Sequence, residues 1–380
     1  MTCSERVWVD ATDIVTWHQH KTGTQRAVAD IIAAYASLRG IRLFCYSQRW
    51  QRFFALRTDD VLAMIGPSGS GGSGRERRRP KRVADFGPGD HLLMLGGDWR
   101  RRGFLPRLAR LRSRIGVRLH HFVHDVMPIT TPHLFPPHET VDCLHYLSRA
   151  FRILDSVVTS SAWNVMQIAD LVAAGRLAEV PLQAVGLGTT SLLCVPPQRP
   201  LVDLPDEFAL SVGTFELKKN RRAIYQVYRL ATATDRLAPL VIAGQPGGLP
   251  DQGIHLLRLD PALSGRVWVL TDVDDSQLVW LYRHCAYTIY GSLAEGWGIP
   301  IDESLSFGAP CLCSTEAAMP EVAGDAACYF NPYDPDSLLA LLRQAADPAT
   351  LARWRQQITS VYRPRTWVDI AQAIDAWITR

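Results

Sequence analysis

Short apolar runs alternate with segments whose apolar residues recur at helical spacing along most of the chain. Strands separated by helices favour α/β domains with parallel sheets, because neighbouring parallel strands need a crossover connection. In the first half we expect a helix over 25–38 and strands over 6–9, 41–46, 91–95, 117–123 and 156–159. In the second half we expect strands over 208–212, 240–243, 267–270, 287–290 and 310–314, helices over 221–231, 276–284 and 301–307, and a last pair of helices from 336 onward.

The length of 380 residues predicts two such domains. Residues 195–205 contain four prolines, which is typical of a linker between domains. We therefore expect an N-terminal domain over 1–195 and a C-terminal domain over 196–361. Ligands of open α/β sheets collect at the carboxyl ends of the strands, so the two domains are expected to face one another across a binding cleft.

Composition excludes several classes of protein. The chain is 47% hydrophobic and 21% charged, which is ordinary for a globular protein. No run of 18 apolar residues occurs, and the first residues lack the basic and apolar regions of a secretion signal. The eight scattered cysteines then indicate reduced core residues, and we expect a cytoplasmic protein.

Positive charge is concentrated between residues 75 and 118. This stretch holds 14 basic and four acidic residues, whereas the whole chain has a formal net charge of only +4. Such a patch attracts phosphate groups, and we expect an anionic membrane surface or a phosphorylated lipid. Nucleic acid is not expected, because no recognition motif or base-stacking aromatic pattern accompanies the charge. The preceding GPSGSGGSG at 66–74 is expected to be a flexible loop.

The most informative segment runs from Ser292 to Pro332. A glycine-rich turn follows the strand that ends near Tyr290, and a helix begins near Ile301. Glycines let the backbone approach a ligand, and amide groups at a helix start can hold a phosphate. Glu295 and Glu303 lie in this turn and on this helix, where their carboxylates could accept hydrogen bonds from sugar hydroxyls.

This segment resembles the retaining nucleotide-sugar glycosyltransferases of family 4, whose signature is E-G-[FW]-G-[LI]-P-x-x-E. The matching residues are Glu295, Gly296, Trp297, Gly298, Ile299, Pro300 and Glu303. The resemblance continues through Gly308–Pro310, Pro320–Ala326 and Asn331–Pro332. It implies the GT-B architecture of two Rossmann-like domains, with the C-terminal helices over 362–380 packed back on the first domain. It also implies that Glu295 is catalytic, that Glu303 binds the ribose, and that Trp297, Gly298 and Ile299 bind the donor.

Ser211–Asn220 (SVGTFELKKN) resembles the strand and loop V-G-T-x-E-P-R-K-N of the same family. Two adjacent cations at a strand end suit a diphosphate, and the resemblance assigns Lys218 and Lys219 to the donor's diphosphate. Lys218 stands where the family more often has arginine, and Leu217 where it has proline. Positive charge is retained, but the bidentate geometry of arginine is lost.

Three further segments in the first half resemble this family or lie at strand ends. Gly23 and Thr24 open a helix in a T-G-x-Q-R segment, and we assign them to donor binding, with Thr24 as a helix cap. Arg26 serves either the acceptor or the domain surface. His124 follows a strand in an H-D-x-x-P segment and is our catalytic or sugar-contacting candidate, with Asp125 fixing its tautomer. Asp98 is a candidate for acceptor binding, as is Asp125.

Three other residue groups are assigned to structural roles. His120 and His121 are expected to be ordinary core or surface residues with satisfied hydrogen bonds, and they do not suggest a metal site. The acids of Asp272–Asp275 precede a helix, so helix capping explains them. Cys311 and Cys313 lie on a predicted buried strand and are expected to pack in the core.

The implied reaction is transfer of a hexosyl group, with retention, from a nucleoside diphosphate sugar to a hydroxyl of a lipid-linked or oligosaccharide acceptor at the inner face of the cytoplasmic membrane. GDP-mannose is the expected donor, and no metal is expected. Two alternatives stay open. One is a same-fold enzyme that uses GDP-rhamnose or a UDP- or dTDP-sugar, and the other is a catalytically silent GT-B scaffold subunit.

Overall fold

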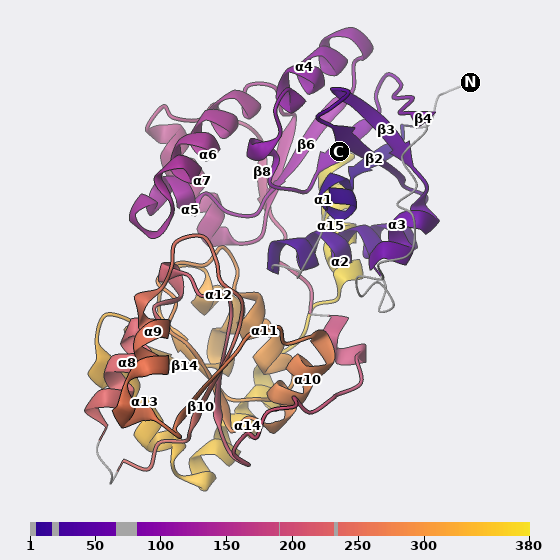
Figure 1. Cartoon of the computed structure of the whole chain (residues 1–380). Helices are drawn as coiled ribbons and strands as arrows, with labels where there is room; N and C mark the ends of the chain where they lie inside the picture. The colour runs from indigo at the N-terminus through magenta and orange to yellow at the C-terminus, as the bar shows by residue number, and fades with distance from the viewer. Residues whose placement is uncertain (1–4, 17–22, 66–81, 190, 232–234) are drawn as a thin grey trace. The chain divides into compact units, whose positions relative to one another are not determined.

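The computed structural model describes residues 5–16, 23–65, 82–189, 191–231 and 235–380 (Figure 1). The chain forms two compact units. The first unit comprises Met1–Thr130, His138–Gly188 and Arg365–Arg380, and the second comprises Thr131–Pro137 and Thr189–Pro364. The glycine-rich segment 66–74, which we expected to be a flexible loop, and the basic residues 75–81 lie outside the described residues.

The first unit is built on a mixed sheet, whose strand order is β4-β3-β2-β1-β5-β6-β7-β8 among the described residues. Its strands are β1 (Val7–Asp10), β2 (Arg42–Ser47), β3 (Arg52–Leu56), β4 (Arg82–Val83), β5 (His91–Met94), β6 (Arg118–Val123), β7 (Ser156–Thr159) and β8 (Leu182–Ala184). The five strands expected in this half are found as β1, β2, β5, β6 and β7.

The expectation of a wholly parallel sheet was wrong at one edge of this unit. Strands β2 and β3 pair antiparallel through a tight turn, and β4 pairs antiparallel with β3. An antiparallel pair needs no crossover helix, so the alternation of strands and helices does not predict it.

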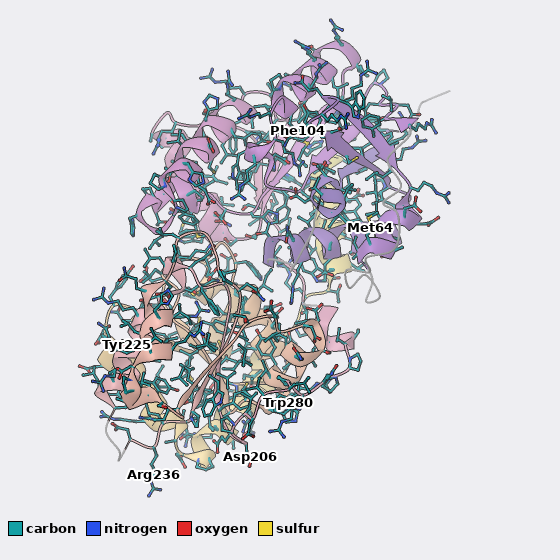
Figure 2. All side chains as sticks on the ribbon, viewed as in Figure 1. Met64, Phe104, Asp206, Tyr225, Arg236 and Trp280 are labelled. Atoms are coloured by element: carbon teal, nitrogen blue, oxygen red, sulfur yellow. The ribbon has the colours of Figure 1, made fainter. Side chains whose placement is uncertain are left out.

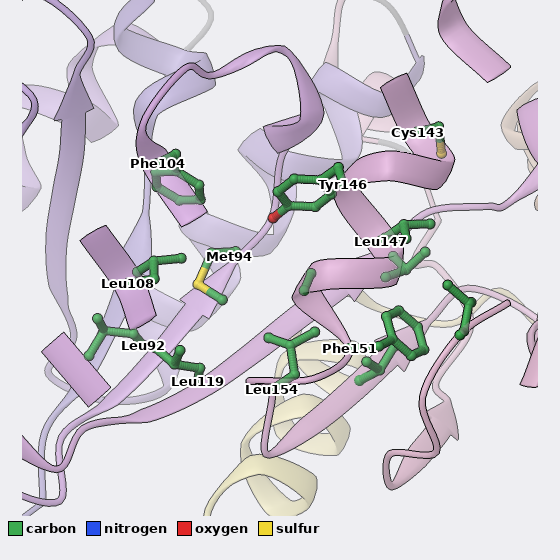
Figure 3. Close-up of a cluster of buried hydrophobic side chains, with 14 of the residues drawn as sticks. Leu92, Met94, Phe104, Leu108, Leu119, Cys143, Tyr146, Leu147, Phe151 and Leu154 are labelled. Atoms are coloured by element: carbon green, nitrogen blue, oxygen red, sulfur yellow. The ribbon is translucent and has the colours of Figure 1, made fainter. Parts of the chain in front are cut away.

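Helices cover both faces of the first sheet. In Figure 1, α4, α6 and α7 lie over one face and α2 and α15 over the other. The helices of this unit are α1 (Thr12–Thr16), α2 (Gly23–Leu38), α3 (Thr58–Ile65), α4 (Phe104–Ile115), α5 (Met127–Thr130), α6 (Pro137–Ala150), α7 (Ala162–Ala173) and α15 (Trp367–Ile378). Figure 3 shows the core on the α4 side, where Leu92 and Met94 of β5 and Leu119 of β6 lie near Phe104 and Leu108 of α4.

The C-terminal helix α15 packs against α2 of the first unit. The hydroxyl of Tyr35 on α2 donates a hydrogen bond to Asp375 on α15 over 2.9 Å. Arg39, which follows α2, forms an ion pair of 2.9 Å with the same carboxylate. The chain therefore returns to the first unit after it has completed the second.

The second unit contains a six-stranded sheet that is parallel throughout, with the order β11-β10-β9-β12-β13-β14 among the described residues. Its strands are β9 (Ala209–Val212), β10 (Leu240–Ala243), β11 (Val267–Leu270), β12 (Tyr287–Tyr290), β13 (Cys311–Ser314) and β14 (Cys328–Phe330). Counted within the unit, this is the order 3-2-1-4-5-6 of a Rossmann fold. The order reverses between β9 and β12.

Both faces of this sheet are also covered. The helices are α8 (Arg221–Leu230), α9 (Gln252–Leu259), α10 (Asp275–His284), α11 (Ile299–Ser306), α12 (Met319–Ala323), α13 (Pro335–Ala345) and α14 (Pro348–Val361). Alternate residues of β10 face two separate cores: Leu240 and Ile242 face one, and Val241 and Ala243 the other. Tyr225 of α8 and Trp280 of α10 accordingly lie on opposite sides of the sheet in Figure 2.

The division between the units falls at Gly188–Thr189, seven residues before the expected boundary. The reason is a short 3-10 helix at Ser191–Cys194, whose Leu192 is buried in the core of the second unit beside α10. The proline-rich stretch therefore follows the first contacts of the second unit and does not precede them. Within the described residues, no helix is both long and apolar enough to cross a membrane.

Candidate functional site

The second unit brings together two of the motifs at the point where its strand order reverses. Strands β9 and β12 are neighbours, and their connections leave toward opposite edges of the sheet, which is where open α/β sheets bind ligands. The loop after β9 carries Lys218 and Lys219, and the loop after β12 carries Glu295. The backbone N–H of Leu293 donates to the carbonyl of Lys218 over 2.8 Å, so the two loops are tied together.

Lys219 and Glu295 form an ion pair at this point, although 76 residues separate them in the chain. Both side chains are 13% exposed. Burial works to raise the pKa of the Glu295 carboxyl, but Lys219, Lys218 and the Ser292 hydroxyl, which donates over 2.8 Å, together hold it below its usual value. Glu295 is therefore an ionised carboxylate beside a cation.

Lys218 is held differently from Lys219. Its ammonium lies 3.4 Å from the carboxylate of Glu216 and 5.0 Å from the ring centroid of Phe135. Phe135 belongs to the short segment Thr131–Pro137 of the second unit. Glu216 in turn accepts hydrogen bonds from the Thr214 hydroxyl and the Gly248 N–H, both 2.9 Å long. The two adjacent lysines thus each have a separate glutamate.

The turn after Glu295 ends in the start of α11. Gly298 caps this helix with φ at +113°, a conformation that L side chains rarely adopt, and Pro300 occupies its first turn. The helix begins at Ile299, two residues earlier than expected. Within the described part of the chain, the buried indole N–H of Trp297 has no hydrogen-bond partner.

Glu303 lies on α11 and is only 2% exposed. Its carboxylate accepts a hydrogen bond of 2.8 Å from the hydroxyl of Tyr282 on α10. No sequence motif marks Tyr282, because the contact joins two helices that are separated by a strand and a loop.

Arg221 is a third cation of this region that the sequence analysis missed. It is 1% exposed, and its guanidinium donates to the carbonyls of Gly213 and Thr214 over 2.7 and 2.9 Å. Burial lowers the pKa of Arg221 to about 10, so it stays charged at neutral pH. It holds the backbone just after the end of β9, in the loop that leads to the two lysines.

The first unit has its own point of reversal, between β1 and β5. Arg101 fills it: its side chain is 6% exposed and forms ion pairs with Asp10, Asp13 and Asp98. Asp98 is fully buried and also lies 3.2 Å from Nε2 of His121. Our acceptor-binding candidate Asp98 therefore contacts Arg101 and His121, two other side chains of the first unit.

His124 follows β6 at the same edge of the sheet. Its Nε2 lies 2.8 Å from the carbonyl of Leu95, and burial lowers the pKa of the imidazole to about 4. The ring is thus neutral at pH 7, and because a carbonyl only accepts, Nε2 carries the proton and Nδ1 does not. The carbonyl of His124 accepts from Ser160 and Asn164 over 3.1 and 2.8 Å, which fixes the loop.

Two expectations in this unit need correction. The Leu95 carbonyl sets the tautomer of His124, whereas Asp125 accepts from the N–H of Met127 over 3.1 Å at the start of α5. Helix α2 begins at Gly23, so Thr24 lies within its first turn and does not cap it. Gly23 and Thr24 are exposed and Arg26 is half-buried.

The structural roles expected for the two histidines, the helix cap and the two cysteines are confirmed. His120 and His121 are 3% and 2% exposed, and Asp274 caps α10 by accepting from the N–H of Gln277. Cys311 and Cys313 are buried on β13. No group of side chains suited to a metal ion occurs in the part of the chain that the structure describes.

Solved structures share the complete fold. HepE from Anabaena, solved with UDP and glucose, has a TM-score of 0.65 at 12% identity, covering 99% of both chains. Sucrose-phosphate synthase from Thermosynechococcus elongatus has a TM-score of 0.63 at 14% identity, covering 99% of this chain and 98% of the other. The fold is that of the GT-B glycosyltransferases.

Residues 197–360, which lie in the second unit, match the family model of the group 1 glycosyl transferases. O-antigen chain mannosyltransferase B of Escherichia coli is 30% identical over 254 residues, which are 62% of this chain and 62% of that protein. Serotype-specific mannosyltransferase WbdA of Escherichia coli is 34% identical over 182 residues, which are 47% of this chain and 22% of that protein. The chain thus matches less than two thirds of the length of either relative.

Proposed function

We propose that this chain is a retaining glycosyltransferase that moves a mannosyl group from GDP-mannose to a hydroxyl of a lipid-linked or polysaccharide acceptor. The observation that carries the proposal is the pairing of Lys219 with an ionised Glu295 at the point of reversal of the second sheet. The choice of mannose is supported by the family resemblance and by the mannosyltransferase names of the two relatives. The choice of retention is supported by the family resemblance alone.

Each residue of the proposed site has its own role in the reaction. Lys218, Lys219 and the amides at the start of α11 stabilise the negative charge that develops on the leaving diphosphate. This is the task that a metal ion performs in other transferases, and we propose that none is needed here. Glu295 stabilises positive charge at the anomeric carbon, and Glu303 binds the ribose. His124 accepts a hydrogen bond from a sugar hydroxyl through Nδ1.

Thermal unfolding with GDP, UDP, ADP and dTDP, each with and without EDTA, tests the donor. A ligand at about 100 times its Kd stabilises the folded state by roughly 2.7 kcal/mol, which raises Tm measurably. We expect that only GDP among the four nucleotides raises Tm and that EDTA does not change this rise. A rise in Tm with UDP or dTDP would mean that the donor is a UDP- or dTDP-sugar and not GDP-mannose. No rise in Tm with any nucleotide would favour a catalytically silent subunit. The anomeric configuration of the product, measured by NMR, tests retention.

We also propose that the first unit binds an anionic membrane surface. Helix α4 carries Arg107, Arg110, Arg112 and Arg114 and no acidic residue. The turn between β2 and β3 presents Trp50, which is 63% exposed, and Arg107 reaches Gln51 of this turn over 3.4 Å. Exposed tryptophan beside arginine suits the boundary between lipid headgroups and acyl chains.

Vesicle flotation tests this surface. Reversal of Arg107, Arg110 and Arg114 to glutamate should abolish binding to phosphatidylglycerol vesicles. Reversal of Arg176, Arg222 and Arg258, which are exposed outside α4, should leave binding unchanged. Equal binding to neutral phosphatidylcholine vesicles, or no difference between the two triple variants, would contradict the proposal.

A further inference from the structure

Tyr282 of α10 makes a buried contact with Glu303 of α11. Its hydroxyl donates to Oε2 of Glu303 over 2.8 Å and lies 3.2 Å from the hydroxyl of Tyr290 on β12. Tyr282 and Glu303 are 1% and 2% exposed. Three elements of the second unit therefore meet at this hydroxyl.

The position of the hydroxyl is set by packing of the ring. Tyr282 stacks on Phe307, which ends α11, with 5.4 Å between ring centroids and 10° between ring planes. A ring held between two helices in this way has one orientation, so its hydroxyl has a fixed location. Burial and the neighbouring Glu303 raise the pKa of Tyr282 well above its usual value, and the hydroxyl stays a donor at physiological pH.

A buried carboxylate is costly unless it is hydrogen-bonded, and the hydrogen bonds that satisfy it also orient it. Orientation matters for a carboxylate that binds a ribose, because its oxygens must match two hydroxyls on adjacent carbons. The contact from Tyr282 approaches Glu303 from the α10 side and fixes one of its oxygens.

We propose that Tyr282 is a positioning residue that orients Glu303 toward the ribose of the donor nucleotide. This inference rests on the proposed function, in which Glu303 binds the ribose of the donor nucleotide. Tyr282 does not touch the nucleotide itself. Its removal should therefore weaken only the part of the binding that depends on ribose hydroxyls.

The test compares Kd for GDP and for 2′,3′-dideoxy-GDP by titration calorimetry. The wild-type chain should prefer GDP by about tenfold, as two hydrogen bonds to a charged group allow. Tyr282→Phe keeps the stacked ring and loses only the hydroxyl. It should weaken the binding of GDP several-fold and leave the Kd for the dideoxy analogue unchanged. Most of the preference for GDP should therefore be lost. Glu303→Gln should remove the preference as well, and the double variant should do no more than Glu303→Gln alone.

Tyr228→Phe is the matched control. Tyr228 is also 1% exposed in the same unit, and its hydroxyl donates to the carbonyl of Ala238 over 2.9 Å. We expect it to keep the full preference for GDP. If Tyr282→Phe keeps the preference too, or weakens both ligands equally, the inference is wrong. If the wild-type chain binds both ligands equally, the ribose role of Glu303 in the proposed function is wrong, and the inference falls with it.

Discussion

The two sheets reverse their strand order at corresponding places, and the chain uses these places differently. Between β1 and β5, Arg101 is 6% exposed and contacts three carboxylates of its own unit. Between β9 and β12, Lys219 and Glu295 are each 13% exposed and pair with one another. Both places hold a cation beside a carboxylate at the carboxyl ends of parallel strands.

The difference lies in how completely the charges are buried and shared. In the first unit one guanidinium serves three carboxylates, and burial raises the pKa of Asp10 in spite of the neighbouring Arg101. In the second unit each lysine has its own glutamate, and the pKa of Glu295 is lowered. Topology alone therefore does not mark a ligand site. We infer that the first place stabilises the fold and that the second serves the ligand.

The largest expected effect is on stability and concerns Arg101. Arg101→Met leaves three carboxylates without their cation, and breaking a buried ion pair typically costs about 3–5 kcal/mol. Denaturant unfolding should show a loss of this size. Arg112→Met is the control, because Arg112 pairs with Asp155 over 2.7 Å at 41% exposure. It should cost less than about 1 kcal/mol. Lost transfer without lost stability in Arg101→Met would instead make the first place a ligand site.

The next effect is on activity and concerns Glu295. Glu295→Gln keeps the shape of the side chain but removes the charge proposed to act at the anomeric carbon. We expect kcat to fall by about 10²–10³, the range found when one transition-state contact is removed. Initial rates of transfer measure it. Glu207→Gln, at an exposed position of the same unit, should behave like the wild-type chain. Full activity in Glu295→Gln would contradict the site assignment.

The two lysines should differ from one another. Lys219→Met removes a diphosphate contact and also leaves Glu295 without its cation. We expect kcat/KM to fall by an amount that corresponds to a loss of about 1.5–3 kcal/mol in transition-state stabilisation, the range for a hydrogen bond to a charged group. Lys218→Met leaves Glu216 with its hydrogen bonds from Thr214 and Gly248 and should cost less. Steady-state kinetics of both variants decide the order. A larger fall in kcat/KM for Lys218→Met than for Lys219→Met would show that the ion pair between Lys219 and Glu295 is not the main contribution of the lysines to catalysis.

The smallest effect is on the pH dependence of stability. The pKa of His124 is lowered from 6.5 to about 4, so the unfolded state binds more protons than the folded state between these values. Its contribution to stability is complete above pH 6.5 and is lost as pH falls toward 4. Glu295, whose pKa is lowered from 4.5, loses its contribution only below that value.

Unfolding measured at several pH values between about 7 and 3 separates these two contributions. His124→Gln should flatten the loss between pH 6.5 and 4.5, and Glu295→Gln should flatten it only at lower pH. Identical profiles for wild type and His124→Gln would mean that this imidazole titrates normally in the folded chain.

Much of the second unit could be predicted from the residues, because its signals are local. The strand β12, the glycine turn and the start of α11 follow from an apolar run, from Gly298 and from Pro300. The cap of α10 follows from Asp274 in the same way. The convergence of Lys219 and Glu295 was expected from the family resemblance, and the structure brings the two residues together.

Short-range chain chemistry therefore decided the elements: periodicity, caps and turns depend on residues a few positions apart. Tertiary structure decided the partners of the charges. Arg101 meets Asp10 across 91 positions, and Tyr282 meets Glu303 across two helices. The antiparallel pairing of β3 and the tautomer of His124, which the carbonyl of Leu95 sets, were decided in the same way. The physical reason is that burial and electrostatics depend on distance in space, and distant segments of a chain become neighbours only when the sheets form.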